Sequence, residues 1–254
     1  MNFLAHYLLA TRYLTPSKPL SAYVVGTALP DLLPLASGRV RLRPAQIERI
    51  NPRTELEAAL SAGVSVHLAT DAAFHKSPAF GEAQAEVGQM LAEAAFDGIR
   101  VRRFFVAHVL TEIALDAVLL RTDPSIADDF YAAFASTDFE AVTHWTEAVT
   151  GEPLPTLAAV LARFARSEYL RQYQSDEGVA SGLSQLCRRA RQDTFDHANF
   201  TRLVSVVKHA MSRLPEFVPA LFSETAALIF SAKQEDANTA ANAGFILKTK
   251  DVSI

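Results

Sequence analysis

The sequence predicts an all-α protein that forms one helical domain. Apolar residues recur at helical spacing along most of the 254 residues, and no alternating strand pattern persists. Half of the residues are hydrophobic, which is ample for a sizeable core. We predict that residues 1–232 form this domain. From Lys233 the composition turns to Gln, Glu, Asp, Asn, Thr and Ala, which predicts a weakly ordered tail over residues 233–254.

The first predicted helix covers residues 1–13, which are largely apolar. Because this segment lacks a basic leading region, we interpret it as part of the mature fold rather than as a signal peptide. A lone histidine such as His6 is more often a hydrogen-bonded core residue than a ligand. Gly26 and Pro30 predict a tight passage, after which Asp31 would either begin a helix or serve as a ligand.

Capping and breaking residues place the remaining helices. Thr54, followed by two glutamates, is typical of a helix start, and the helix that begins there is expected to run into residues 64–75. Asp123 and Pro124 are expected to end a helix over residues 104–120. Further helices are predicted over residues 80–96, 127–135, 139–149, 157–173, 178–191, 195–214 and 217–232.

Two of these helices carry ligand-type side chains at every fourth residue. Residues 64–75 contain His67, Asp71 and His75, and most of the intervening residues are apolar. Each four-residue step around a helix drifts by only about 40°, so the three side chains lie in one stripe. A buried imidazole or carboxylate must be paired or bound, and a metal ion is one such partner.

The helix over residues 104–120 repeats this pattern with His108, Glu112 and Asp116. Facing helices of a bundle can build a two-metal site from histidines and carboxylates. The alternative is a pair of His–carboxylate ladders, hydrogen-bonded without metal. Since the chain has one cysteine, Cys187, a metal site must use nitrogen and oxygen ligands. Such mixed ligands suit manganese, iron or zinc better than magnesium.

Composition excludes several classes of protein. The net charge of -4 and the pI of about 6.0 do not give the basic field of a nucleic-acid-binding protein. No apolar run reaches the roughly 18 residues of a membrane span. A single cysteine suits a reducing compartment, and we expect a cytoplasmic protein. The oligomeric state stays open.

Several short motifs resemble the acyl carrier protein phosphodiesterase family. The chain begins MNFLAH, residues 26–31 form a Gly-x-x-x-x-Asp element, and residues 63–71 read Gly-x-x-x-His-x-x-x-Asp. Residues 167–189 are similar to the late helix pair of that family. The resemblance therefore extends over roughly residues 1–210. The run over residues 26–31 also resembles an element of zinc-dependent phospholipase C-like proteins.

The resemblance implies an all-helical enzyme, distantly related to HD-type metal phosphohydrolases. Such an enzyme removes phosphopantetheine from a serine of a carrier protein and needs a divalent metal, usually manganese. His6, Asp31, His67 and Asp71 match motif positions. His75 stands where the family pattern has a carboxylate, and the helix carrying His108 departs from that pattern as well.

We therefore expect a metal-dependent phosphodiesterase that acts on acyl carrier protein or on a small phosphoester. His6 and Asp71 are the candidate catalytic residues, and His6 would orient water or protonate the leaving oxygen. The candidate metal ligands are Asp31, His67, Asp71, His75, His108, Glu112 and Asp116.

Two groups of arginines, at positions 39, 41 and 43 and at positions 100, 102 and 103, would recruit a phosphate or an acidic carrier protein. Any single one of them is more readily explained as a solvated loop residue. The alternative to an enzyme is a non-catalytic helical metal-binding or interaction protein. An open coordination position facing a cleft would favour the enzyme, and a closed site would favour a structural role.

Overall fold

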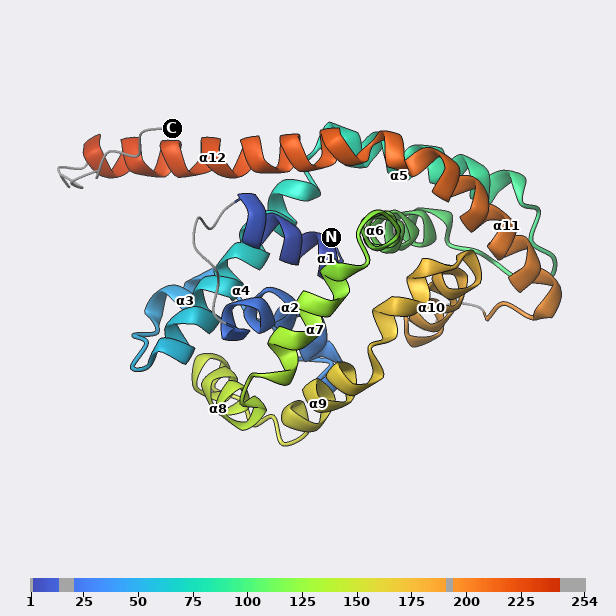
Figure 1. Cartoon of the computed structure of the whole chain (residues 1–254). Helices are drawn as coiled ribbons and strands as arrows, with labels where there is room; N and C mark the ends of the chain where they lie inside the picture. The colour runs from blue at the N-terminus through green and yellow to red at the C-terminus, as the bar shows by residue number, and fades with distance from the viewer. Residues whose placement is uncertain (1, 14–20, 191–193, 243–254) are drawn as a thin grey trace.

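The computed structural model describes residues 2–13, 21–190 and 194–242. These residues form helices and no strand, so the all-α prediction is confirmed. Figure 1 shows the helices, which are α1 (Phe3–Leu8), η1 (Leu9–Tyr13), α2 (Ser21–Ala36), α3 (Pro44–Arg49), α4 (Glu55–Phe74), α5 (Pro78–Glu93), α6 (Arg103–Thr122), α7 (Ser125–Ala135), α8 (Phe139–Thr150), α9 (Leu157–Ser167), η2 (Tyr169–Gln174), α10 (Asp176–Arg189), α11 (His197–Arg213), η3 (Leu214–Glu216) and α12 (Val218–Asn242).

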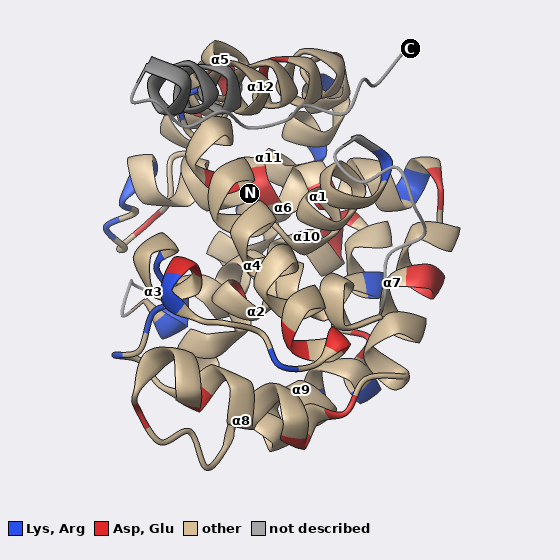
Figure 2. Cartoon of the chain, turned by 90° about the vertical axis from the view of Figure 1, so that its left-hand side faces the viewer, with Lys and Arg blue, Asp and Glu red and all other residues tan. Residues whose placement is uncertain are grey.

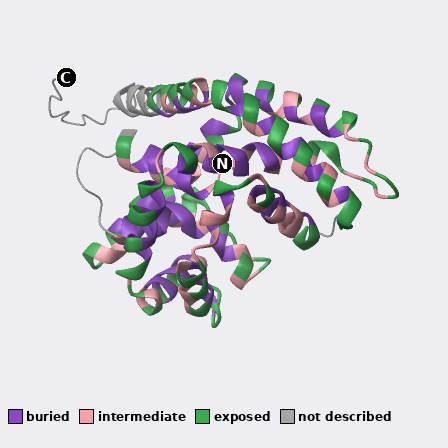
Figure 3. Ribbon diagram, turned by 45° about the vertical axis from the view of Figure 1, so that its right-hand side comes forward, coloured by how far each residue is buried: buried purple, intermediate pink, exposed green. Residues whose placement is uncertain are grey.

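In the middle of the molecule, α1 packs against α2, α4 and α6, and α2 packs against α4. The long helix α12 runs beside α5 along one edge, and α8 and α9 lie at the opposite edge (Figure 1). Buried residues gather where the central helices meet, and exposed residues line the periphery (Figure 3). None of the helices in the described ranges is long and apolar enough to cross a membrane.

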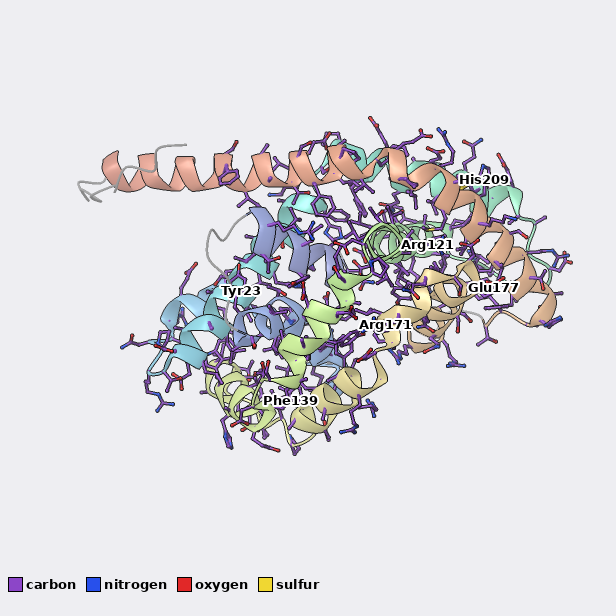
Figure 4. The ribbon with its side chains drawn as sticks, in the orientation of Figure 1. Tyr23, Arg121, Phe139, Arg171, Glu177 and His209 are labelled. Atoms are coloured by element: carbon purple, nitrogen blue, oxygen red, sulfur yellow. The ribbon has the colours of Figure 1, made fainter. Side chains whose placement is uncertain are left out.

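Two glycines let α2 and α4 approach each other backbone to backbone. A Cβ atom at Gly63 would lie 2.2 Å from the carbonyl oxygen of Tyr23, a residue of α2 that Figure 4 labels. A Cβ atom at Gly26 would lie 2.8 Å from the carbonyl oxygen of Leu60. Real Cβ atoms do not come this close to a backbone oxygen, so the crossing requires glycine on both helices. The crossing holds the middle of α2 against the helix that carries His67.

Replacing Gly63 by alanine is expected to destabilise the protein by about 3 kcal/mol, because the added methyl group forces α2 and α4 apart. Gly81 in α5 is the matched control, since a Cβ atom there meets nothing within 4 Å. Gly81→Ala should stabilise the protein by about 0.5–1 kcal/mol through helix propensity. Denaturant unfolding measures both free energies. Equal stability of the two variants would contradict the close crossing.

The prediction of a tight passage around Gly26 and Pro30 is wrong, because α2 continues through Pro30 and Pro34. Each proline removes one backbone donor, which ordinarily ends or kinks a helix. Here every residue over positions 22–29 is buried, and packing against α4 outweighs the local preference. Asp31 therefore lies inside a helix and not at its start.

Two other boundaries differ from the prediction. The helix predicted over residues 157–173 ends at Ser167, because Glu168 adopts a left-handed conformation with φ of 43°, and η2 follows. α12 continues through Asn242, beyond the expected start of the tail at Lys233. Alanine, glutamine, glutamate and lysine in this stretch are good helix formers, which accounts for the continuation. The rest of the predicted tail, residues 243–254, lies outside the described residues.

Candidate metal centre

Three ligand-type side chains from three helices form a group that we call the inner triad: His6 of α1, Asp31 of α2 and His67 of α4. One ligand atom from each lies within 4.8 Å of the others. The imidazole rings of His6 and His67 stack with their centroids 3.8 Å apart, and Nε2 of His67 is 3.8 Å from a carboxylate oxygen of Asp31. His6 and His67 are almost fully buried, and the Asp31 side chain is 38% exposed.

Hydrogen bonds that Nδ1 donates orient both histidines of the inner triad. Nδ1 of His67 donates to the carbonyl oxygen of Thr27, over 2.7 Å. Nδ1 of His6 lies 2.8 Å from the hydroxyl oxygen of Thr70, and that hydroxyl can donate to backbone carbonyl oxygens of its own helix. The hydroxyl therefore accepts from His6. In both rings Nδ1 carries the proton, which leaves the Nε2 lone pair for a cation.

A second group, the outer triad, consists of His75 at the end of α4 and His108 and Glu112 of α6. The Nε2 atoms of the two histidines are 3.1 Å apart, and each lies 3.2 Å from the same oxygen of Glu112. Nδ1 of His75 donates to the carbonyl oxygen of Asp71, over 2.8 Å. The stripe of α4 therefore meets the stripe of α6 at His75, whereas His67 and Asp116, which were expected to converge with it, lie elsewhere.

Asp71 lies between the two triads. Its Oδ1 atom is 3.9 Å from Nε2 of His6 and 3.5 Å from Nδ1 of His75, and its side chain is 41% exposed. Eight residues of helix span about 12 Å, so His67 and His75 cannot share one ion. The α4 stripe thus contributes one residue to each triad and places Asp71 midway.

The protein environment shifts the pKa values of the carboxyl groups in opposite directions. Desolvation of the carboxylate beside the buried histidines raises the pKa of Asp31, although 38% of the side chain is exposed, and the facing imidazole of His67 partly opposes this shift. Burial also acts to raise the pKa of Glu112, but nearby positive charge and hydrogen bonds from His108 and His75 outweigh it and hold the pKa well below its usual value. The hydrogen bond to Glu112 raises the pKa of His75. The outer triad is therefore a strongly anionic carboxylate between two imidazoles.

Asp116, a predicted ligand, belongs to neither triad. Its two oxygens accept the backbone N–H groups of Leu4 and Ala5, over 3.0 and 2.9 Å. These donors lie in the first turn of α1, whose N-cap residue Asn2 makes no capping bond through its side chain. Asp116 follows His108 by about 12 Å along α6, where α1 lies against it. The fully buried carboxylate of Asp116 thus caps α1, and burial raises its pKa to about 7.

Asp116→Ala is expected to lower the free energy of unfolding by about 3 kcal/mol, because two buried N–H groups lose their acceptor. Asp116→Asn retains one carbonyl acceptor and should cost about 1 kcal/mol. The metal content of both folded variants should equal that of the wild type. A variant that is as stable as the wild type in denaturant but has lost its metal would instead show that Asp116 is a ligand.

The arginines that were expected to recruit the substrate divide into two groups. The side chain of Arg41 donates to the carbonyl oxygens of Gly38 and Val40 and so stabilises its own loop. Lys and Arg positions lie on the side of the molecule where α3 lies (Figure 2). Arg102 and Arg103 are exposed at the start of α6, the helix that carries His108.

Sequence reasoning missed the groups that orient the imidazoles. The carbonyl oxygen of Thr27 has no signature in a sequence, since every residue has one. Thr70 stands one position before Asp71, on the same helix as His67, and its residue type gives no sign that it accepts from His6. His6 itself was expected to orient water or protonate a leaving group, but its burial within the inner triad suits a ligand better.

Comparison of the chain with protein-family models, with curated proteins and with solved structures gave no match.

Proposed function

We propose that the protein is a metal-dependent phosphoester hydrolase whose centre lies between α1, α2, α4 and α6. One observation carries the proposal: six His, Asp and Glu side chains form two adjoining triads, with Asp71 between them. Three of the four histidines donate or present Nδ1 to an oxygen and direct Nε2 into the centre. In metal sites, a histidine commonly donates the N–H of its other ring nitrogen to an oxygen in this way, which fixes the tautomer that binds the metal.

The inner triad would hold a divalent ion, for which its two imidazoles and one carboxylate are suitable donors. Such an ion lowers the pKa of bound water and neutralises charge on phosphoryl oxygens. Asp71 is part-exposed and in reach of both triads, so its Oδ1 would orient the attacking water and accept its proton. Manganese, iron and zinc all suit this donor set.

The proposed substrate is the phosphopantetheine diester of an acyl carrier protein. The resemblance of the MNFLAH start and of residues 26–31 and 63–71 supports this choice. Arg102 and Arg103 support it as well, because they offer exposed positive charge on the helix of the outer triad. A small phosphoester or a phospholipid head group is the alternative substrate, with the same chemistry at the centre.

A non-catalytic metal-binding protein is the second candidate. The burial of His6 and His67 favours it, since structural metal sites are closed. The exposure of Asp31 and Asp71, at 38% and 41%, favours an enzyme because it gives the centre a side that faces solvent. We therefore retain the enzyme as the proposal.

The test is a substrate panel with purified protein loaded in turn with manganese, iron and zinc. The panel contains holo acyl carrier protein, a chromogenic phosphodiester and a phospholipid. We expect release of phosphopantetheine from the carrier protein. Cleavage of the other esters alone would support phosphoester hydrolysis but exclude the carrier protein as the substrate. A fully loaded protein that cleaves none of them would favour the binding protein.

A further inference from the structure

The geometry of the outer triad matches the ligand spacing around a single ion. Its three ligand atoms are mutually 3.1, 3.2 and 3.2 Å apart. Zinc ligands at about 2.0–2.1 Å in a tetrahedral arrangement are about 3.3 Å from one another. Two histidines and one glutamate form a known ligand set of catalytic zinc, with the fourth position open.

The hydrogen-bonding roles of the two imidazoles are also compatible with a bound cation. Nδ1 of His75 already donates to the carbonyl oxygen of Asp71, so neutral His75 presents a lone pair at Nε2. This lone pair faces Nε2 of His108 and the Glu112 carboxylate, which offers only acceptors. Either Nε2 of His108 carries a proton and donates within the triad, or a cation lies among the three ligand atoms and is bound by all of them.

The two triads differ in access to solvent. The histidines of the inner triad are almost fully buried, whereas His75 and His108 keep 31% and 29% of their side chains exposed. Ligand exchange at a metal requires water or a chelator to reach it. An ion in the inner triad would therefore be bound by two buried imidazoles and would face solvent on the side of Asp31, whereas an ion in the outer triad would have two part-exposed imidazoles and would exchange more readily.

We propose that the outer triad binds a second divalent transition-metal ion, which exchanges with solvent while the inner triad retains its own ion. The role of this ion rests on the proposed function: it would add positive charge beside Asp71, where a phosphoester anion would bind. The binding itself can be tested without substrate.

The experiment measures metal content by mass spectrometry after loading with Zn²⁺ and removal of free metal. His108→Ala removes a ligand of the outer triad, and Asp31→Asn weakens the inner triad. Both side chains are part-exposed, so the fold should survive, and circular dichroism checks this. His209→Ala is the matched control, because His209 is an exposed histidine of α11 (Figure 4).

The wild type and His209→Ala should hold about two equivalents of zinc, and His108→Ala about one. Brief exposure to a chelator should reduce the wild type to about one equivalent and leave His108→Ala unchanged. In a titration, His108→Ala should weaken the second binding event by roughly 100-fold or more. The visible spectrum of bound Co²⁺ should lose the contribution of the exchangeable ion in that variant.

Equal zinc content of His108→Ala and the wild type would overturn the inference and identify a protonated, metal-free triad. Loss of all zinc in folded His108→Ala would also overturn it, because the triads would then not bind independently. If His108→Ala does not fold, His108→Gln takes its place. Because no substrate is involved, two bound ions without hydrolysis would refute the proposed function alone, and hydrolysis with one bound ion would refute this inference alone.

Discussion

Asp71→Asn is expected to reduce phosphoester hydrolysis by at least about 100-fold, while the helical fold persists. The amide has nearly the shape of the carboxylate, but it has neither the negative charge nor the ability to accept a proton from water. The side chain is 41% exposed, so the change leaves no buried cavity. Steady-state kinetics with saturating metal measures the loss, and circular dichroism measures the fold.

Asp129→Asn provides the control for this change, because Asp129 is an exposed aspartate of α7 outside both triads. It should retain the wild-type rate. The proposed role of Asp71 would be wrong if Asp71→Asn hydrolysed its substrate as fast as this control at every metal concentration.

Complete removal of metal is expected to lower the melting temperature of the protein substantially. An ion that binds only the native state adds about 4 kcal/mol to the free energy of unfolding when its free concentration is about 1,000 times its Kd. The inner triad joins α1, α2 and α4, so losing this ion leaves stacked imidazoles and a carboxylate without their common partner. Thermal melts before chelation, after chelation and after reloading measure the effect.

Reloading should restore the original melting curve. An unchanged curve in protein whose metal content has been shown to be close to zero would count against a bound ion. The triads would then be hydrogen-bonded His–carboxylate ladders, the alternative that the sequence leaves open.

The fold was predictable wherever a local signal decides the structure. Thr54 begins α4 and accepts a hydrogen bond from Glu57, as its capping pattern indicates. Asp123 likewise follows the last residue of α6, Thr122, where Asp123 and Pro124 were expected to end this helix. The course of α2 was not predictable, because two prolines argue against a helix and only its packing against α4 sustains one.

The candidate site was predictable in its residue types and only partly in its grouping. The four-residue spacing predicted that the two stripes converge, and the structure brings one member of the α4 stripe, His75, to His108 and Glu112 of α6. It could not indicate that the stripes separate into two triads, since this depends on where the helices cross. It also placed Asp116 with the ligands, because the spacing contains no information that α1 begins against α6 and needs an acceptor there.

The glycines of the two motifs acquire a physical explanation from the structure. Gly63 stands four residues before His67, and Gly26 stands one residue before Thr27. Their close crossing brings the carbonyl oxygen of Thr27 to Nδ1 of His67. The motif spacing therefore encodes helix packing and ligand orientation together.

We expect His6, Asp31 and His67 to hold a metal ion together. The most direct measurement is an anomalous difference map from a crystal of the protein loaded with zinc. We predict a peak about 2.0–2.2 Å from Nε2 of His6, Nε2 of His67 and a carboxylate oxygen of Asp31. A map with no peak there, from a crystal whose zinc content has been confirmed, would contradict a metal ion in the inner triad.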